Sequence, residues 1–434
     1  MPNMKSESIN TRWNYLIKGV FLIILAVYWW ERMRGPGWGD SLLFIVSSLE
    51  GFSWSVNATG HFLYDNLNVL FVFLIPWVEP AALLTVISIL YAMLTLVRIY
   101  QTAFILTENS FAAILATIGL AFSFTFWRQV EQVEVYTCAC FLVTSAAYSI
   151  LSDTKSGTYN NIIASGCWMG LAILVHIQTI LLLPFYLLYI FQAWSKNRRQ
   201  ASISLIAVLF PFMLLIIPAI ILSDYTIGSV FFGFNFQDEV LNFGFRSILT
   251  GTILSIAYVL YSFHIHIIAV VFGFVICFRN SARMFVLIMT GIIPVWVFAL
   301  RYTVSDQYVF FLNAYIFLAI ISTYGYDTLI QLIKGTRWKA VLLVLALLSS
   351  PVVYAVSLRV ALHIPQIQGF HKHKEYKGGL SYFMWPGLRK TPEIFPVFRR
   401  QMQTGIPADI IDQELWNRLY NHALNYQKLI EERK

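Results

Sequence analysis

The stretch "FTFWRQVEQVEVY", residues 124–136, raises the question on which the interpretation of this chain depends. It lies between two long apolar runs, yet it carries Arg128, Glu131 and Glu134 within seven residues. Charges placed next to the hydrocarbon core of a membrane are costly, and they usually face an aqueous cavity or a partner. The role of this stretch therefore depends on the side of the membrane that it faces and on the groups that share that side.

The composition of the chain identifies its broad class. Of 434 residues, 58% are hydrophobic and only 12% are charged, whereas a soluble domain has about a quarter charged residues. The mean hydropathy is +0.67, and apolar stretches of about 20 residues recur, each long enough to cross a hydrocarbon core of roughly 30 Å. The sequence thus predicts an all-α polytopic membrane protein. Its net charge of +8 is interpreted by location along the chain, and it is not taken as a sign of nucleic-acid binding.

The apolar stretches predict about eleven transmembrane helices. Residues 61–78 contain Asp65 and Asn68 and follow a Gly- and Ser-rich segment, which favours an interfacial or re-entrant helix over a span. The run 162–194 would form a single helix about 50 Å long, too long for one straight crossing, so we divide it near His176. The predicted spans are 13–31, 82–100, 108–127, 135–152, 160–175, 177–194, 201–222, 250–277, 284–300, 308–326 and 338–357.

The positive-inside rule orients these spans. With a cytoplasmic N-terminus, the basic segments 196–199, 279–283 and 334–339 lie inside, and most acids outside the C-terminal region lie on the outer face. We divide the chain into a transmembrane domain, 1–357, whose first outer loop spans about 32–81, and an outer polar tail, 358–434. The end of the tail carries apolar residues at helical spacing, which predicts an amphipathic helix. The four cysteines lie in apolar segments and are expected to be packing residues.

Acidic residues of two outer loops are the candidates for chemistry. Asp40 follows a Gly-Pro-Gly-Trp-Gly turn at the start of an apolar run, where it is either a helix N-cap or a carboxylate base that faces a cleft. If 131–136 is helical, Glu131 and Glu134 share one face beside Tyr136. The alternative is a solvated loop, or an Arg128–Glu131 ion pair that holds the helix ends.

The order of these features resembles a GT-C glycosyltransferase, with one span, a long outer loop containing an early Asp, two spans and a short acidic outer loop. "FSFTFWRQVEQVEVYTCACF" (122–141) resembles a pattern of a bacterial membrane family related to protein O-mannosyltransferases, and segments 170–184, 302–320 and 376–390 resemble further motifs of that family. Two positions depart from the pattern. Leu43, in "DSLLF" (40–44), stands where the family has Glu, and "NATG" (57–60) stands where it has His-Pro-Pro-Gly.

The resemblance implies inverting transfer of a sugar from a polyprenyl-phosphate donor to a hydroxyl of a protein, lipid or glycan acceptor. It also implies a bacterial inner membrane, with the site facing the periplasm or exterior. Such a reaction needs a carboxylate that takes the acceptor's proton, the role assigned to Asp40. Cations stabilise the departing lipid phosphate, and arginine can bind phosphate oxygens in pairs. The candidates for substrate binding are Arg128, Glu131, Glu134, Tyr136, His176, Arg246, Arg301 and Asp306. A divalent cation is compatible with these acids, but nothing in the sequence demands one, and no metal ligands are assigned.

Two other classes of function stay open at the level of sequence. A transporter or lipid flippase would place charges or Gly/Pro breaks at mid-bilayer, and prolines do interrupt some spans (Pro211, Pro218 and Pro294). A non-catalytic membrane subunit of an assembly is favoured by the absence of Glu at Leu43 and by the amphipathic tail. Against the transporter stands the clustering of acids at helix ends on one face.

Overall fold

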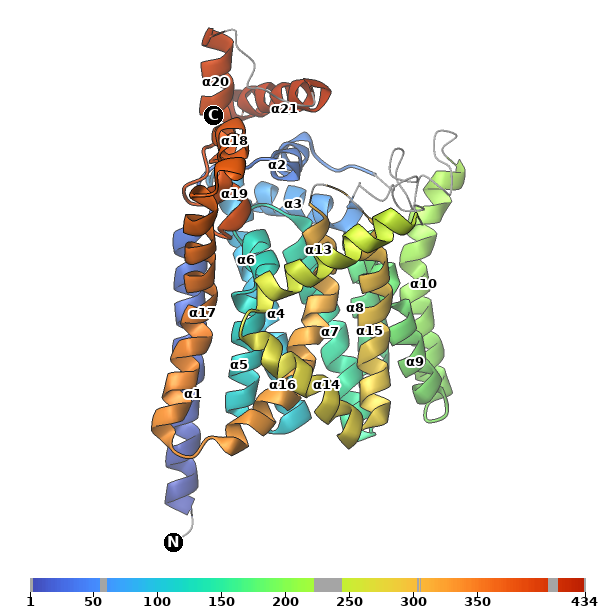
Figure 1. The fold of residues 1–434 in the computed structure, drawn as a ribbon. Helices are drawn as coiled ribbons and strands as arrows, with labels where there is room; N and C mark the ends of the chain where they lie inside the picture. Colours follow the sequence, from blue (N-terminus) through green and yellow to red (C-terminus); the bar gives the residue numbers. More distant parts are fainter. Residues whose placement is uncertain are drawn as a thin grey trace.

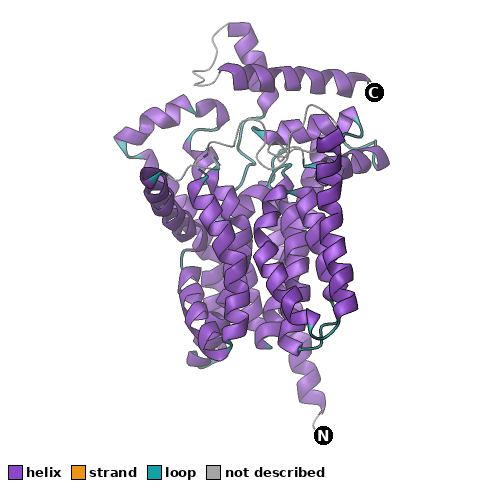
Figure 2. Ribbon diagram, turned by 90° about the vertical axis from the view of Figure 1, so that its right-hand side faces the viewer, coloured by secondary structure: helices purple, strands orange, loops and turns teal. Residues whose placement is uncertain are grey.

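The computed structural model describes residues 3–54, 61–221, 244–302, 304, 306–404 and 413–432. Within these residues the regular structure is helical throughout, without a strand (Figure 2). The chain forms a bundle with the N-terminus at one end and the C-terminus at the other (Figure 1). We call the end that carries α2 (Asp40–Glu50), α3 (Phe62–Leu74) and the C-terminal helices the cap end. The segment "NATG" lies outside the described residues.

Seven helical segments in the described part of the chain are long and apolar enough to cross a membrane, or eight if the bent pair α5 (Ser110–Ala121) and α6 (Phe124–Val130) is one span. Helices α8 (Ile162–Val175) and α14 (His266–Asn280) are shorter and apolar, and α1 (Asn3–Glu31) and α10 (Arg198–Ile221) also run along the bundle. The all-helical membrane architecture is confirmed, whereas the count of eleven spans stays a prediction. The seven segments are α4 (Pro80–Thr107), α7 (Val135–Ser156), η1 with α9 (Ile177–Leu182 and Leu183–Trp194), α13 (Phe245–Phe263), α15 (Ala282–Arg301), η2 with α16 (Gln307–Phe311 and Leu312–Leu332) and α17 (Thr336–Leu362).

The order of the helices agrees with the predicted distribution of charge. The basic connections after α9, α14 and α16 lie at the end opposite the cap end (Figure 1), as the positive-inside rule predicts. Helix α3 lies across the cap end and not along the bundle, as expected of an interfacial helix, and its place relative to a membrane stays a prediction. The predicted division of 162–194 is confirmed, because α8 ends at Val175 and the chain turns back at His176.

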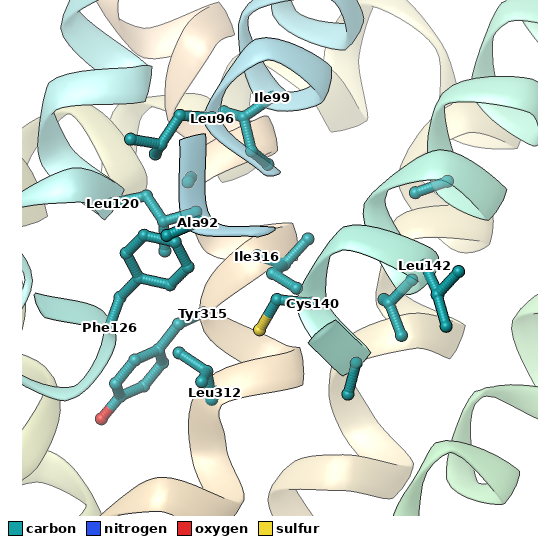
Figure 3. Close-up of a cluster of buried hydrophobic side chains, with 14 of the residues drawn as sticks. Ala92, Leu96, Ile99, Leu120, Phe126, Cys140, Leu142, Leu312, Tyr315 and Ile316 are labelled. Carbon is teal, nitrogen blue, oxygen red and sulfur yellow. The ribbon is translucent and has the colours of Figure 1, made fainter. Parts of the chain in front are cut away.

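The core of the bundle surrounds α16, which packs against α4, α5, α7, α14 and α15. Figure 3 shows this core, in which Phe126, Cys140 and Tyr315 lie among aliphatic side chains. Helices α14 and α16 approach so closely that a Cβ at Gly325 would overlap the carbonyl oxygen of Ala269. The four cysteines are free, and all but Cys167 are buried, which is consistent with packing residues.

Two predicted spans are bent, and both predictions need correction. The segment 108–127 is not one straight helix, because the chain bends by 70° between α5 and α6. At this bend the Ser123 hydroxyl donates to the Leu120 carbonyl (2.8 Å) and Ser123 becomes the N-cap of α6. The segment 250–277 breaks at His264, whose φ of 42° ends α13. The His264 ring packs on Tyr354 at this break (centroids 4.9 Å apart).

The C-terminal region covers the cap end with α18 (Pro365–His373), η3 (Glu375–Lys377), α19 (Leu380–Met384), α20 (Ile394–Thr404) and α21 (Gln413–Glu432). Glu31, the last residue of α1, fixes this region: its Oε2 accepts from Trp385 Nε1 (3.1 Å), and its carbonyl accepts from the Leu388 amide (2.9 Å). The amphipathic helix predicted at the end of the tail is confirmed as α21. It packs on α2 and buries Leu419 and Tyr426.

Candidate active site

The stretch 124–136 lies at the cap end, and its three charged residues are buried. After the 70° bend, α6 carries Arg128 into the protein, and all of its residues are buried. Glu131 follows α6, and Glu134 precedes α7 with an extended backbone (φ −147°). Residues 131–134 are therefore not helical, and the expectation that Glu131 and Glu134 share a helix face is wrong. Because the backbone at Glu134 is extended, the carboxyl groups of Glu131 and Glu134 have different surroundings.

The Glu131 side chain faces the protein interior. It is fully buried, and its Oε1 accepts from Trp127 Nε1 (2.8 Å), whereas its Oε2 has no hydrogen-bond partner. Burial raises the pKa of Glu131 well above its ordinary value, although the Trp127 hydrogen bond and Arg128 act in the opposite direction. The alternative interpretation, an Arg128–Glu131 ion pair, is not observed, since the ion pair found within 4.0 Å among the described residues is Lys428–Glu432. Glu131 is thus placed to hold α6, away from solvent.

Glu134 faces the other acids of the cap end. Burial raises the pKa of Glu134 well above its ordinary value, and the nearby charges of Asp40 and Asp306 raise it further. Burial also raises the pKa of Asp306, to which Asp40 again contributes. Like charges that share a site disfavour each other's ionised form. Asp40 and Asp306, from two other segments of the chain, are thus near enough for their charges to act on Glu134, and the Arg128 charge acts on it in the opposite direction by lowering its pKa.

Asp40 is the first residue of α2 and is exposed. The N-cap of α2 is Gly39, in a positive-φ conformation (75°), and no side chain caps the helix. The interpretation of Asp40 as an N-cap is therefore wrong. Its carboxylate is left exposed, near enough for its charge to act on Asp306 and on the buried Glu134.

A cluster of rings borders these acids. The His176 ring lies beside Tyr136 and His61, with centroids 5.2 and 5.1 Å apart. His176 Nδ1 accepts from the Gln178 amide (3.2 Å), so that its proton is on Nε2, and His61 Nδ1 donates to the Val175 carbonyl (3.2 Å). Burial lowers the pKa of His61, whereas the Asp40 charge raises it. His61 was not identified from the sequence, where its only signal is its place after Gly60.

The predicted arginines occupy different places. Arg128 is 2% exposed, its Nη1 has no hydrogen-bond partner, and its guanidinium lies over the Tyr382 ring (4.1 Å to the centroid). Arg301 ends α15. Arg246 is exposed in the first turn of α13, and the start of this helix lies well away from α6 (Figure 1). Tyr382 and its neighbour Lys377 were not assigned from the sequence, although both lie in the segment 376–390 whose pattern stood out.

No group of three His, Cys, Asp or Glu residues within the described ranges is arranged to hold a metal ion. The charge of Asp40 acts on Glu134 and on Asp306, but the three carboxyl groups do not form such a group. The arrangement instead combines an exposed carboxylate, two acids with raised pKa values and a buried cation. This combination can take up a proton and stabilise an anion at neighbouring points.

Comparison with known proteins gives two kinds of similarity. The family model of the Protein O-mannosyl-transferase TMEM260 N-terminal domain matches residues 56–199. No curated protein matches the sequence. Among solved structures, ArnT from Cupriavidus metallidurans bound to undecaprenyl phosphate has a TM-score of 0.58 and 15% identity, over 86% of this chain and 70% of that chain. The apo form of the same ArnT has a TM-score of 0.57 and 16% identity, again over 86% of this chain and 70% of that chain.

The oligosaccharyltransferase of Archaeoglobus fulgidus, tethered to an acceptor peptide containing the NVT sequon, is also similar. Its TM-score is 0.51 at 13% identity, over 88% of this chain and 61% of that chain. At these identities the similarity concerns the fold. The matched segment 56–199 contains Arg128, Glu134, Tyr136 and His176, whereas Asp40 and Asp306 lie outside it.

Proposed function

We propose that this chain, a membrane enzyme with the GT-C glycosyltransferase fold, moves a sugar from a polyprenyl-phosphate donor to a hydroxyl acceptor at the cap end, with inversion. The observation that carries the proposal is the convergence of Asp40, Glu134 and Asp306 beside the buried Arg128. Perturbed acids and an unpaired cation gathered in one place are typical of a reaction site. The ArnT structure that shares this fold holds undecaprenyl phosphate, which supports a donor of this lipid class.

The reaction assigns one role to each group. The acceptor oxygen attacks the anomeric carbon while its proton passes to the Asp40 carboxylate. The bond between the anomeric carbon and the phosphate oxygen breaks, and its electron pair leaves with the polyprenyl phosphate. Arg128 stabilises the charge that develops on this leaving group. Attack opposite to the leaving group inverts the anomeric centre.

The neighbouring groups bind and orient the substrates. The raised pKa of Glu134 favours its protonated form, so it donates a hydrogen bond to the sugar or the acceptor. Tyr136 and His176 line the same place, and His176 presents Nε2–H. Asp306 is a further contact for sugar hydroxyls. Arg301, at the end of α15, is a further candidate for a phosphate contact, whereas Arg246 lies in the first turn of α13, away from α6, and is given no such role. Glu131 positions α6 rather than touching substrate.

The orientation follows from the charge distribution. The basic connections lie at the end opposite the cap end, so this end faces the cytoplasm under the positive-inside rule. The site then opens to the periplasm or exterior of a bacterial inner membrane. The donor would enter from the lipid phase, and the acceptor, a protein, lipid or glycan hydroxyl, from the aqueous side.

The test compares wild type, Asp40→Asn and Glu50→Gln, purified in detergent and incubated with radiolabelled polyprenyl-phosphate sugars and with hydroxyl acceptors. Glu50 is exposed at the other end of α2 and serves as the control. Removing a general base costs about 10²–10⁴-fold in rate, so Asp40→Asn should lose transfer and Glu50→Gln should keep it within about twofold. Equal transfer by wild type and Asp40→Asn would remove Asp40 from the role of base.

A further inference from the structure

Two cations lie together at the cap end without an anion between them. Arg128 of α6 is almost completely buried, and its Nη1 has no hydrogen-bond partner. Lys377 of η3 comes close enough for the Arg128 charge to act on it: burial lowers the pKa of Lys377 to about 8, and Lys374 and Arg128 contribute to this lowering. Within the described residues neither cation has a carboxylate within 4.0 Å. Like charges desolvated side by side are unfavourable, so an anionic ligand would stabilise the arrangement.

Aromatic rings hold both cations in place. The Tyr382 ring lies 4.1 Å from the Arg128 guanidinium carbon and 5.7 Å from Lys377 Nζ. Lys377 Nζ also lies 5.5 Å from the Trp38 ring and 5.7 Å from the Tyr376 ring. Cation–π attraction of this kind orients a cation without neutralising its charge. The rings therefore orient both side chains without supplying a counter-charge.

Hydrogen bonds to other parts of the fold hold the segment that contains Lys377. Trp385, eight residues further along, donates to Glu31 of α1, and the following amide of Leu388 donates to the Glu31 carbonyl. Trp38 of the first loop donates from Nε1 to the Pro392 carbonyl (2.9 Å). The segment 375–392 is thus held against α1 and the first loop, on the same side as α6.

The neighbouring acids do not compensate for the two cations. Burial raises the pKa values of both Glu131 and Glu134, which favours their neutral forms. Arg128 nevertheless acts on Glu134 as well as on Lys377. An anion held by Arg128 and Lys377 would therefore lie next to the acids that we place at the reacting centre.

We propose that Arg128 and Lys377 together bind the phosphate monoester of the polyprenyl carrier, so that the C-terminal segment 375–392 forms one wall of the donor site. The guanidinium supplies paired donors to the phosphate oxygens, and the ammonium supplies a compact charge. The proposal rests on the proposed function for the identity of the lipid. The ligand chemistry itself, a phosphate monoester anion, is shared by the lipid headgroup and by free phosphate.

The test measures binding without turnover. Full-length protein in detergent is titrated with undecaprenyl phosphate, with uncharged undecaprenol and with inorganic phosphate, for wild type, Lys377→Gln, Arg128→Gln and Lys372→Gln. Lys372 is exposed on α18, close in sequence, and is the matched control. We expect Lys377→Gln and Arg128→Gln to weaken undecaprenyl phosphate binding at least tenfold, with undecaprenol within twofold of wild type. Lys372→Gln should bind all three as wild type does.

The other outcomes decide the remaining questions. Unchanged undecaprenyl phosphate binding in Lys377→Gln would overturn the proposal, and so would an equal loss of undecaprenol binding. Competition by inorganic phosphate that disappears in Lys377→Gln would show that the site recognises the phosphate group itself, whereas competition that persists would place free phosphate elsewhere and count against the site. If Arg128→Gln fails to fold, Lys377→Gln and Lys377→Arg carry the test, and Lys377→Arg should retain binding.

The binding test is separate from the proposed function. Asp40→Asn should bind undecaprenyl phosphate as wild type does while it loses transfer. Selective phosphate binding in a protein without any transfer activity would refute the proposed function and leave the phosphate site standing. Transfer that is lost in Asp40→Asn but unaffected in Lys377→Gln would support the proposed function and refute the phosphate site.

Discussion

The substitution Glu131→Gln tests whether this buried carboxyl group is neutral in the folded protein. Glu131 is fully buried, and its single side-chain hydrogen bond is the one that Trp127 Nε1 donates. A glutamine side chain is nearly isosteric with a protonated glutamate, and its amide oxygen would still accept from Trp127. The substitution therefore removes the ability to ionise while it preserves the hydrogen bond.

The expected magnitude follows from proton linkage. The usual pKa of a glutamate is about 4.3, and burial raises that of Glu131 well above it. A carboxyl group whose folded-state pKa is raised contributes stability that is complete below the unfolded pKa and is lost as pH rises towards the folded pKa. The loss is at most about 1.4 kcal/mol per pH unit. Between pH 5 and pH 7, wild type should thus lose up to about 2.7 kcal/mol relative to Glu131→Gln.

The assay is unfolding of the purified protein by SDS in mixed micelles at several pH values. Glu131→Ala, which leaves the buried Trp127 N–H without an acceptor, should be less stable by about 1–3 kcal/mol. Glu108→Gln, which replaces an exposed carboxyl, is the control and should follow the wild-type slope. If Glu131→Gln follows that slope too, the carboxyl is ionised in the folded state and the reasoning fails. A loss of transfer in a fully stable Glu131→Gln would show instead that Glu131 touches substrate.

Three further predictions concern packing, the C-terminal cover and the arginines. Gly325→Ala should destabilise the bundle by about 1–3 kcal/mol in SDS titrations, because a Cβ there overlaps the backbone of α14. The control Gly19→Ala, whose Cβ would have nothing within 4 Å, should not destabilise it. Equal stability of the two variants would contradict the close packing of α14 and α16. Trp385→Phe should cost about 1 kcal/mol and speed proteolysis of the C-terminal region, since it removes the hydrogen bond to Glu31; an unchanged cleavage rate would mean that this bond does not hold the region. Arg246→Gln should keep transfer within about twofold, because this arginine is exposed at the start of α13; a large loss would place the donor phosphate there.

The sequence predicted the class of fold because the bilayer sets simple conditions on length and charge. The polar residues in 61–78 were enough to predict that α3 does not cross the bilayer, and the length of 162–194 was enough to divide it at His176. The bends were missed, since apolar periodicity continues through them. At the turn the Ser123 amide and hydroxyl both donate to the Leu120 carbonyl, and at the break the His264 ring contacts Tyr354, which is 90 residues away in sequence.

The candidate site could be predicted where polar residues border apolar runs. Glu134 and Asp306 lie just before predicted spans, Asp40 starts an apolar run in the first outer loop, and in the structure the charges of Asp40 and Asp306 act on Glu134. The prediction that Glu131 shares a helix face with Glu134 was wrong because residues 131–134 are not helical. Lys377 was missed because it lies in a polar segment whose path cannot be read locally. Gly378, which follows it with a φ of 103°, ends the short helix η3.

The absence of Glu at Leu43 is the strongest argument for a non-catalytic subunit, and the structure weakens it. Leu43 lies one turn after Asp40 on α2, yet the acids beside Asp40 come from two other segments and do not depend on this position. A buried arginine with an unsatisfied donor, next to a second cation, also costs stability. A subunit that served only to hold an assembly together would gain nothing from such an arrangement. An enzyme that binds an anion and moves a proton at this place would use both the two cations and the acids beside them.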